Sequence, residues 1–486
     1  MKHVILGAGP AGVIAAETLR KNAPADQIVI IGDEPEAPYS RMAIPYLLIG
    51  NIGESGTHLR HSADHFAKLR ITLQHGRAKS VDTAARCVLL DDGSSVPFDR
   101  LLIATGSSPA TPPIPGIQGP GVHPCWTLED ARAIMDLAQP GARVVQMGAG
   151  FIGCIIMESL ATRGVKLSVV EMGDRMVPRM MGPTAGGMIK DWCEKKGVTV
   201  YTGARVEAVE RPAAPLPAAA PAAAPAEPTP EPGLLSRLAH ALGLGSDPAP
   251  APAAVAAPVA AAAPAPSAPM VVCLSTGQRI EADLVISATG VKPNIGFLEN
   301  SGITCLQGVL TDECLQTSVP GIYAAGDCVE AFDKVSGTTM VSAIQPNAAE
   351  QARVAALNMV GQRTELRGVT QINVLDTLGL ISTSFGNWQG VPGSEQADHV
   401  ELTDRQANGG KGRHLSLQFK DDVMVGCNSV GWTEHVGVMR GLVEGAVRLG
   451  PWKDVLKQDP TKLMEAYLGS AQAQGRWSGA ADERRR

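Results

Sequence analysis

A glycine-rich turn near the start of the chain is the feature that most constrains its fold. An apolar run, residues 3–7, ends in Gly7-Ala-Gly9-Pro-Ala-Gly12, and a helix-forming segment over residues 13–19 follows. In such a strand–turn–helix unit the first glycine allows the tight turn and the second lets a pyrophosphate approach the backbone. The third lets the helix pack close to the strand. The sequence therefore predicts a dinucleotide-binding fold at this point.

The segment after this helix supplies the acidic residue that the fold requires. Residues 27–32 form a second apolar run, which ends in Asp33-Glu34. Glu34 stands 22 residues after Gly12 and is placed to accept hydrogen bonds from ribose hydroxyls. The chain contains 53 glycines, so a glycine pattern alone is weak evidence. The strand, the helix and the acidic residue around the turn decide the assignment.

The same arrangement occurs a second time, far along the chain. Gly148-Ala-Gly150-Phe-Ile-Gly153 follows an apolar run at residues 142–147 and precedes a helix-forming segment at residues 154–163. The next predicted strand, residues 166–170, leads to Glu171, which stands 18 residues after Gly153. Two complete sets of this kind predict an α/β protein with two Rossmann-like domains.

Glu171 also bears on the choice of coenzyme. A carboxylate at this position would accept a hydrogen bond from a free ribose 2′-hydroxyl and repel a 2′-phosphate. The sequence therefore favours NADH over NADPH. Arg175 and Arg179 follow closely in the sequence and moderate this preference.

Three shorter motifs organise the rest of the chain. Ala104-Thr105-Gly106 and Ala288-Thr289-Gly290 each end an apolar run, and Gly326-Asp327 ends a third. After residue 339, helix-like and strand-like segments alternate without a glycine fingerprint. We therefore expect a first domain over residues 1–110 and 291–338, a second over 111–290, and a C-terminal α+β interface domain over 339–475.

An Ala/Pro-rich insert, residues 211–269, interrupts the second domain. Its composition cannot build a core and is typical of extended, disordered chain. Strand-like sequence before it, residues 198–210, resumes at residues 271–274, so we expect the insert to replace a hairpin loop. Residues 233–244 match a short amphipathic helix, which folds back on the body, forms transiently, or serves as a tethered docking peptide. Its apolar face would carry Leu234, Leu235, Leu238 and Leu242.

Charge, cysteine usage and hydropathy exclude several classes of protein. A net charge of −6 argues against a general nucleic-acid surface. The nine cysteines include no CxxC and no metal-like cluster, which indicates reduced thiols in a cytoplasmic protein without a metal site. No strongly apolar run reaches the length of about 18 residues that a membrane span requires.

The two glycine turns, the two Ala-Thr-Gly motifs and Gly326-Asp327 together resemble the FAD-dependent pyridine nucleotide-disulfide oxidoreductase superfamily. The similarity is greatest to rubredoxin and ferredoxin reductases and to the flavin module of NADH-dependent nitrite reductases. It covers roughly residues 1–210 and 270–470. The resemblance implies an FAD-binding first domain, an NADH-binding second domain, and a last domain that covers the flavin and often forms a homodimer.

The resemblance also implies roles for individual residues. The first turn and Glu34 would hold the ADP part of FAD, and Arg41 of Tyr39-Ser-Arg41 would reach its phosphate or ribose. Asp327 would bond the ribityl chain, and the second turn with Glu171 would hold NADH. The expected cofactor-binding residues are Gly7, Gly9, Pro10, Ala11, Gly12, Glu34, Arg41, Lys79, Ala104, Thr105, Gly106, Gly148, Gly150, Phe151, Ile152, Gly153, Glu171, Gly290, Gly326 and Asp327.

Three departures from the family pattern narrow the expected chemistry. The chain lacks the CxxxxC pair that disulfide reductases carry near the flavin. Met42 stands where members that reduce coenzyme A disulfide or peroxide have a single cysteine, and methionine cannot become a thiolate or a sulfenic acid. Ile155 stands where many members place a glutamate near the nicotinamide. No side chain is identified as a catalytic acid, base or nucleophile.

We therefore expect an NADH-dependent FAD oxidoreductase that passes a hydride from NADH to FAD and then electrons to an external acceptor. The acceptor would be a redox protein partner or a small oxidant, since the chain has neither a cysteine pair nor iron–sulfur ligands. Two alternatives stay open. One is an NADH oxidase or quinone reductase, and the other is a non-catalytic subunit in which bound nucleotides stabilise a larger complex.

Overall fold

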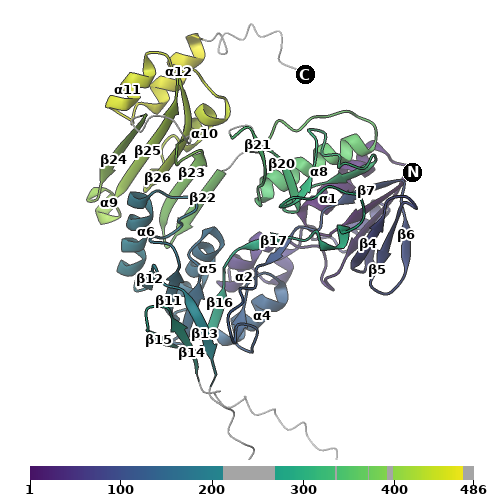
Figure 1. Ribbon diagram of the computed structural model, residues 1–486, viewed down its shortest axis with the longest axis horizontal. Coiled ribbons are helices and arrows are strands. Elements are labelled where there is room, and N and C mark those ends of the chain that lie inside the picture. The colour runs from purple at the N-terminus through teal and green to yellow at the C-terminus, as the bar shows by residue number, and fades with distance from the viewer. Residues whose placement is uncertain (212–268, 334–335, 370–371, 391–397, 474–486) are drawn as a thin grey trace, which may run out of the picture. The chain divides into compact units, whose positions relative to one another are not determined.

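The computed structural model describes residues 1–211, 269–333, 336–369, 372–390 and 398–473 (Figure 1). The expected helix at residues 233–244, with nearly all of the Ala/Pro-rich insert, lies outside these residues. The described residues from Met1 to Glu210 and from Val271 onward belong to one compact unit. Within the described ranges, none of the helices combines the length and apolar character needed to cross a membrane.

The first Rossmann-like domain is built on a parallel sheet that combines two distant parts of the chain. Helix α1 (Pro10–Asn22) follows its central strand, and helix α8 (Gln345–Met359) packs against α1. One edge strand of this sheet comes from a segment far along the chain. In spatial order the strands are β19 (Ile322–Ala324), β7 (Arg100–Ile103), β1 (Lys2–Leu6), β2 (Gln27–Gly32) and β3 (Ile71–His75).

Small side chains explain how α1 and α8 reach each other and the sheet. Helix α1 buries glycine and alanine, and helix α8 buries four alanines. These side chains share one core cluster with the strands of the first sheet, so α8 belongs to the first domain by its packing. The domain limits stay a prediction. The packing of α8 favours a C-terminal domain that begins after residue 369 rather than at residue 339.

The second Rossmann-like domain repeats this architecture. Helices α4 (Leu128–Leu137), α5 (Phe151–Thr162) and α6 (Pro183–Lys195) accompany a second parallel sheet. In spatial order its strands are β12 (Thr199–Thr202), β11 (Lys166–Glu171), β10 (Arg143–Met147), β16 (Leu284–Ser287) and β9 (Val122–His123).

A small antiparallel sheet in this domain carries the insert. Strand β13 (Val206–Glu210) pairs with β14 (Met270–Leu274), which also pairs with β15 (Arg279–Ala282) in the order β13-β14-β15. Glu210 lies opposite Val271 in the antiparallel register. The two ends of the insert are therefore adjacent strand residues, which confirms that the insert occupies the place of a hairpin loop.

Short elements connect and flank the two parallel sheets. A three-stranded sheet has the order β4 (Ala78–Asp82), β5 (Cys87–Leu90) and β6 (Ser95–Pro97), and another has the order β18 (Val309–Leu310), β20 (Val329–Asp333) and β21 (Thr338–Val341). Strand β8 (Ser107–Pro109) pairs with β17 (Val291–Pro293). The short helices are η1 (Arg41–Ala43), α2 (Ile44–Leu48), η2 (Glu54–Thr57), α3 (His65–Lys68) and η3 (Gly296–Leu298).

The C-terminal domain is an antiparallel sheet with helices on one face (Figure 1). Buried apolar side chains, including Phe385, Leu415 and Phe419, pack against these helices. The strands, in spatial order, are β22 (Ile372–Thr377), β23 (Leu380–Gly386), β26 (Val423–Val430), β25 (Arg413–Lys420) and β24 (His399–Asp404). The helices are α9 (Ala407–Gly410), α10 (Val436–Glu444), α11 (Trp452–Gln458) and α12 (Leu463–Ala473).

The other face of this sheet carries buried polar side chains among apolar ones such as Val430. Ser384, Ser416 and Asn428 are each at most 5% exposed, and they alternate along their strands with the apolar residues of the helix-covered face. Strand β26 of this sheet contacts helix α6 of the second domain. The two predicted Rossmann-like folds and the C-terminal α+β domain are thus confirmed.

Candidate functional site

A cavity of about 260 Å³ lies where strands β1, β2 and β7 end. The carboxyl ends of parallel strands are the usual location of ligand sites in open α/β sheets. The start of α5, in the second domain, and Ala348 of α8 also contribute to its wall. Thirteen of the expected cofactor-binding residues line it, namely Gly7, Gly9, Pro10, Ala11, Glu34, Arg41, Ala104, Thr105, Gly106, Phe151, Ile152, Gly326 and Asp327.

The glycines of the first turn have the geometry that a pyrophosphate site requires. Gly7 has φ +111°, and a Cβ there would stand 2.1 Å from the carbonyl oxygen of Ala104. A Cβ on Gly12 would stand 1.9 Å from the carbonyl oxygen of Gly7, so helix and strand approach too closely for any side chain. By contrast, a Cβ on Gly9 meets no atom within 4 Å. The turn is closed on the protein side and open at Gly9, which fits a bound FAD.

Glu34 is held by two neighbours at the cavity wall. Arg41 Nη2 donates to Glu34 Oε1 at 2.6 Å, and the Tyr39 hydroxyl donates to Glu34 Oε2. The Arg41 guanidinium lies 5.5 Å from the ring centroids of both Tyr39 and Trp126, which is within cation–π range. Burial raises the pKa of Tyr39, so its phenol keeps the proton that it donates. Each carboxylate oxygen of Glu34 retains a second lone pair for a ribose hydroxyl.

Asp327, in the turn after β19, also lines this cavity. Ser107 Oγ donates to Asp327 Oδ2 at 3.0 Å. Burial raises the pKa of Asp327, while the Ser107 hydrogen bond opposes this shift. A partly desolvated carboxyl group next to a cavity is suited to bonding hydroxyl groups of a ligand.

The second glycine turn has the same geometry as the first. Gly148 has φ +94°, and a Cβ there would stand 2.4 Å from the carbonyl oxygen of Ala288. A Cβ on Gly153 would stand 2.5 Å from the carbonyl oxygen of Gly148. Gly150, like Gly9, has open space where a Cβ would project. This turn therefore fits the pyrophosphate of a second dinucleotide.

The sequence led us to expect a Glu171 carboxylate that is free to bind a ribose, but in the structure backbone N–H groups of the protein engage it. Its side chain is turned inward, because Oε2 accepts from the Ala149 N–H and Oε1 from the Gly173 N–H, both at 2.8 Å. The residue is 9% exposed. Arg175 is also engaged, donating to the carbonyl oxygens of Met181 and Pro178 and to Asp174. The contact of Glu171 with ribose stays a prediction.

The two Ala-Thr-Gly turns stand at opposite ends of the antiparallel strand pair β8–β17, which forms the crossover between the domains. Thr105 Oγ1 donates to the carbonyl oxygen of Asn294, and Thr289 Oγ1 donates to that of Ala110. Gly290 accepts from the Ala110 N–H at 2.8 Å through its own carbonyl. Gly290 thus contributes to the crossover, and its role in cofactor binding stays a prediction.

Lys79 is not brought to either glycine turn. It is exposed on β4, and it is not among the described residues that line the cavity. Nothing in the described structure supports the expected cofactor contact of Lys79.

One described cysteine, Cys125, lines the cavity, and burial raises the pKa of its thiol to about 12. All nine cysteines are free, and Cys154 and Cys328 are fully buried. Burial raises the pKa of Cys328 to about 11, so it is protonated at neutral pH. Met42 and Ile155 both line the cavity. Among the residues described, no group of acidic, histidine and cysteine side chains could hold a metal ion.

Several lining residues were not identified from the sequence. Trp126, whose indole N–H donates to the Ser107 carbonyl at 3.1 Å, stacks near Arg41. Ser107 contacts Asp327, and Gln345 accepts a hydrogen bond from Ser40 through its side-chain amide oxygen. One sequence signal could have pointed to Trp126, namely that the chain has only six tryptophans and one of them stands in the crossover. A tryptophan in the Pro-rich crossover has few apolar neighbours in sequence to pack on.

Comparisons with known proteins agree with this geometry. A family model described as pyridine nucleotide-disulphide oxidoreductase matches residues 1–217 and 257–356. The chain is 28% identical over 463 residues to the NADH-dependent phenylglyoxylate dehydrogenase subunit epsilon of Aromatoleum evansii, covering 94% of this chain and 95% of that protein. It is 28% identical over 449 residues to the NADH oxidase of Methanocaldococcus jannaschii, covering 89% and 88%. The covalent putidaredoxin reductase–putidaredoxin complex has a similar fold, with a TM-score of 0.77, 20% identity, and coverage of 96% of this chain and 98% of that chain.

Two glycine turns of this geometry, with a cavity that reaches from the first turn to the helix after the second, define a flavin- and nicotinamide-dependent oxidoreductase. The chain belongs to the pyridine nucleotide-disulphide oxidoreductase family. It is an NAD(P)H-dependent FAD oxidoreductase, and its cofactors are FAD and NADH.

Proposed function

We propose that this protein transfers electrons from NADH, through FAD, to a separate redox protein. The observation that carries the proposal is the composition of the cavity wall. Residues of the FAD fold, such as Gly9 and Asp327, share the cavity with Phe151, Ile152 and Ile155 of helix α5, which begins at the second glycine turn. A nicotinamide held by the second domain would therefore reach the flavin across α5.

The proposal assigns binding roles to the residues at the cavity. The open backbone at Gly9 would take the FAD pyrophosphate, Glu34 and Arg41 the adenosine end, and Asp327 the ribityl hydroxyls. When bound, FAD supplies the redox chemistry, accepting a hydride and giving up electrons. The side chains of Met42, Ile152 and Ile155 would exclude water from the reaction, and Asp327 would orient the cofactor through its carboxyl oxygens.

The nature of the acceptor is supported by the departures from the family pattern and by the named relatives. Met42 cannot serve as a thiol nucleophile, so disulfide and peroxide substrates are disfavoured. The structural neighbour was determined in complex with putidaredoxin, which is a separate protein. We propose a redox protein of comparable kind as the acceptor, and a cytoplasmic location in keeping with nine free thiols.

A second candidate function is electron transfer within a larger complex. The relative from Aromatoleum evansii is named as one subunit of an NADH-dependent dehydrogenase, and the similarity extends over 94% of this chain. The acceptor would then be an associated subunit rather than a diffusing protein. Direct oxidation by oxygen is a further alternative, since another relative is named an NADH oxidase.

Steady-state electron transfer should separate these functions. We expect the purified protein to contain about one FAD per chain and to transfer electrons from NADH to ferricyanide much faster than to oxygen, by at least about tenfold. A ferredoxin-type iron–sulfur protein should also be reduced faster than oxygen. NADPH, assayed in parallel, should be slower because of Glu171. Electron transfer to oxygen as fast as to ferricyanide would favour the NADH oxidase function. An absence of turnover with every acceptor would contradict an enzymatic role for the chain on its own.

We further propose that the insert contributes to docking of the acceptor, through the sequence-predicted helix at residues 233–244. The insert joins two paired strands, with Glu210 opposite Val271, so a short turn would be enough to connect them. The apolar face predicted for the helix, with Leu238 at its centre, would then serve a function other than folding.

Deleting residues 212–268 and closing the hairpin with a short Gly-containing turn should preserve the FAD content and keep the NADH-to-ferricyanide rate within about twofold. Closing a shorter loop costs less chain entropy, so stability should be unchanged or slightly higher. Transfer to the natural acceptor should weaken selectively. Leu238→Asp should reproduce much of this loss, whereas His240→Asp, predicted on the opposite face, should not. Loss of FAD on deletion would mean that the insert is part of the fold.

A further inference from the structure

The loop between β11 and α6, residues 172–182, connects the second glycine turn to the C-terminal sheet. At its start the loop is bonded to the turn at Ala149, whose N–H donates to Glu171 Oε2 at 2.8 Å. The Ala149 carbonyl in turn accepts from the Val177 N–H at 2.9 Å. Both backbone groups of Ala149, the residue directly before Gly150, are therefore engaged by this segment of chain.

Val177 makes this hydrogen bond although its own backbone conformation is unfavourable. Its φ is +50°, a region that β-branched residues rarely adopt because the side chain crowds the backbone. The carbonyl of Val177 accepts from the N–H groups of Met180 and Met181, each at 3.0 Å. Such a conformation persists only where its surroundings hold it in place. The end of the loop must therefore be fixed.

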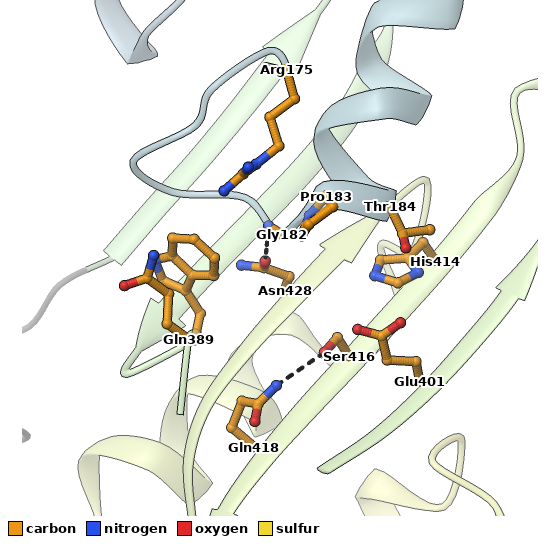
Figure 2. Close-up of a pocket in the computed structure, with 11 residues that line it drawn as sticks. Arg175, Gly182, Pro183, Thr184, Gln389, Glu401, His414, Ser416, Gln418 and Asn428 are labelled. Atoms are coloured by element: carbon orange, nitrogen blue, oxygen red, sulfur yellow. Dashed lines mark hydrogen bonds between the residues drawn. The ribbon is translucent and has the colours of Figure 1, made fainter. Parts of the chain in front are cut away.

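Asn428 of β26 fixes the end of the loop from the C-terminal domain. Its Oδ1 accepts from the Gly182 N–H at 2.8 Å (Figure 2). Its Nδ2 donates to the Met180 carbonyl at 2.9 Å. The side chain is 2% exposed. One side-chain amide thus satisfies both a donor and an acceptor of the loop. Buried backbone groups that lose such partners are costly to leave unpaired.

These hydrogen bonds act together with apolar packing, because Val177 and Met181, each 1% exposed, share a core cluster with Val430 of β26. A cavity of about 250 Å³ lies beside the loop and the start of α6, and Asn428 is part of its wall. The side chains that face it are mostly polar and include Thr184, His414, Ser416 and Gln418 (Figure 2). Ser416, on the neighbouring strand, contacts Gln418 and makes no hydrogen bond to the loop among those the structure describes.

We propose that Asn428 is a positioning residue for NADH binding. Asn428 holds the end of the loop at Met180 and Gly182. The fixed loop keeps the Val177 N–H bonded to the Ala149 carbonyl. Ala149 in turn fixes the backbone at Gly150, where the coenzyme pyrophosphate would bind. The C-terminal domain therefore contributes to the shape of the coenzyme turn through this amide side chain. This inference rests on the proposed function, in which the second glycine turn binds NADH.

The test compares Asn428→Ala and Asn428→Asp with Ser416→Ala, all as FAD-loaded full-length protein. Binding of ADP-ribose, a non-reducing fragment of the coenzyme, is measured by calorimetry, and flavin reduction is measured at increasing NADH concentration. For Asn428→Ala we expect an ADP-ribose Kd and a half-saturating NADH concentration that rise about tenfold, with the limiting reduction rate changed less than about twofold. Asn428→Asp keeps the acceptor for Gly182 and should fall between Asn428→Ala and wild type.

Hydrogen exchange supplies a readout that does not depend on activity. In Asn428→Ala, amides of residues 172–182 and of the turn at residues 149–151 should exchange faster, while Ser416→Ala should match wild type. Unchanged ADP-ribose affinity in Asn428→Ala, or an equal loss in Ser416→Ala, would overturn the positioning role. A fall in limiting rate together with lost FAD would mean a general structural role. Failure of wild type to bind ADP-ribose would instead contradict the proposed function itself.

Discussion

Replacing Gly9 by valine should give a folded protein that has lost its flavin. Gly9 has φ −77° and ψ −174°, which is extended backbone that valine adopts readily. A Cβ there meets no protein atom within 4 Å, so the new side chain would project into the cavity without disturbing the turn. It would occupy the space that the FAD pyrophosphate needs. We expect FAD content to fall from about one per chain to below about a tenth.

The measurement is flavin absorbance released on denaturation, divided by protein concentration, with circular dichroism to follow the fold. Gly12→Val provides the contrast, because a Cβ at Gly12 would stand 1.9 Å from the Gly7 carbonyl oxygen. That substitution should unfold the domain rather than empty the site. A yellow Gly9→Val protein with full FAD content would show that the first turn does not bind the pyrophosphate.

The parts of the site that the sequence predicted are those that local chain geometry determines. A strand, a turn with glycines at fixed spacing and a helix form one continuous segment, so Gly7, Gly9 and Gly12 could be assigned roles without knowing the rest of the fold. The second turn, at Gly148 and Gly150, was predicted for the same reason. The positive φ of Gly7 and Gly148, and the open space at Gly9 and Gly150, agree with those roles.

The parts that the sequence did not predict depend on contacts between distant segments. Ser107 reaches Asp327 because they follow β7 and β19, which are neighbouring parallel strands although far apart in sequence. Trp126 likewise reaches Arg41 from a distant segment. Helix α8 carries no signal of its own, and its alanines become informative only once α1 is known to lie against them.

Glu171 illustrates a different limit of sequence reasoning. Its position after β11 was correctly located, but the spacing from Gly153 cannot tell whether the carboxylate points outward to a ribose or inward to the backbone. In the structure, two backbone N–H groups compete for it, those of Ala149 and Gly173. Such competition between a ligand and the protein's own donors is decided by three-dimensional geometry.

Replacing Gly150 by valine should produce the reciprocal defect, a protein that keeps FAD but is no longer reduced efficiently by NADH. Gly150 has φ −76° and ψ −170°, and its Cβ position is open within 4 Å, as at Gly9. The valine side chain would therefore be tolerated by the fold and would block the pyrophosphate of the coenzyme. At an NADH concentration near the wild-type half-saturation value, the rate of flavin reduction should fall by about 100-fold, equivalent to about 2.7 kcal/mol of lost binding.

Stopped-flow absorbance of the flavin measures this rate, and reduction by dithionite, which needs no coenzyme site, serves as the internal control. Gly9→Val and Gly150→Val are matched in substitution, backbone conformation and open space, so a difference between them reports which turn binds which dinucleotide. If Gly150→Val lost FAD, while Gly9→Val kept FAD but was no longer reduced efficiently by NADH, the two assignments would have to be exchanged. If it were reduced by NADH at the wild-type rate, the coenzyme would bind elsewhere, and Ala149, Val177 and Asn428 would have no role in positioning it.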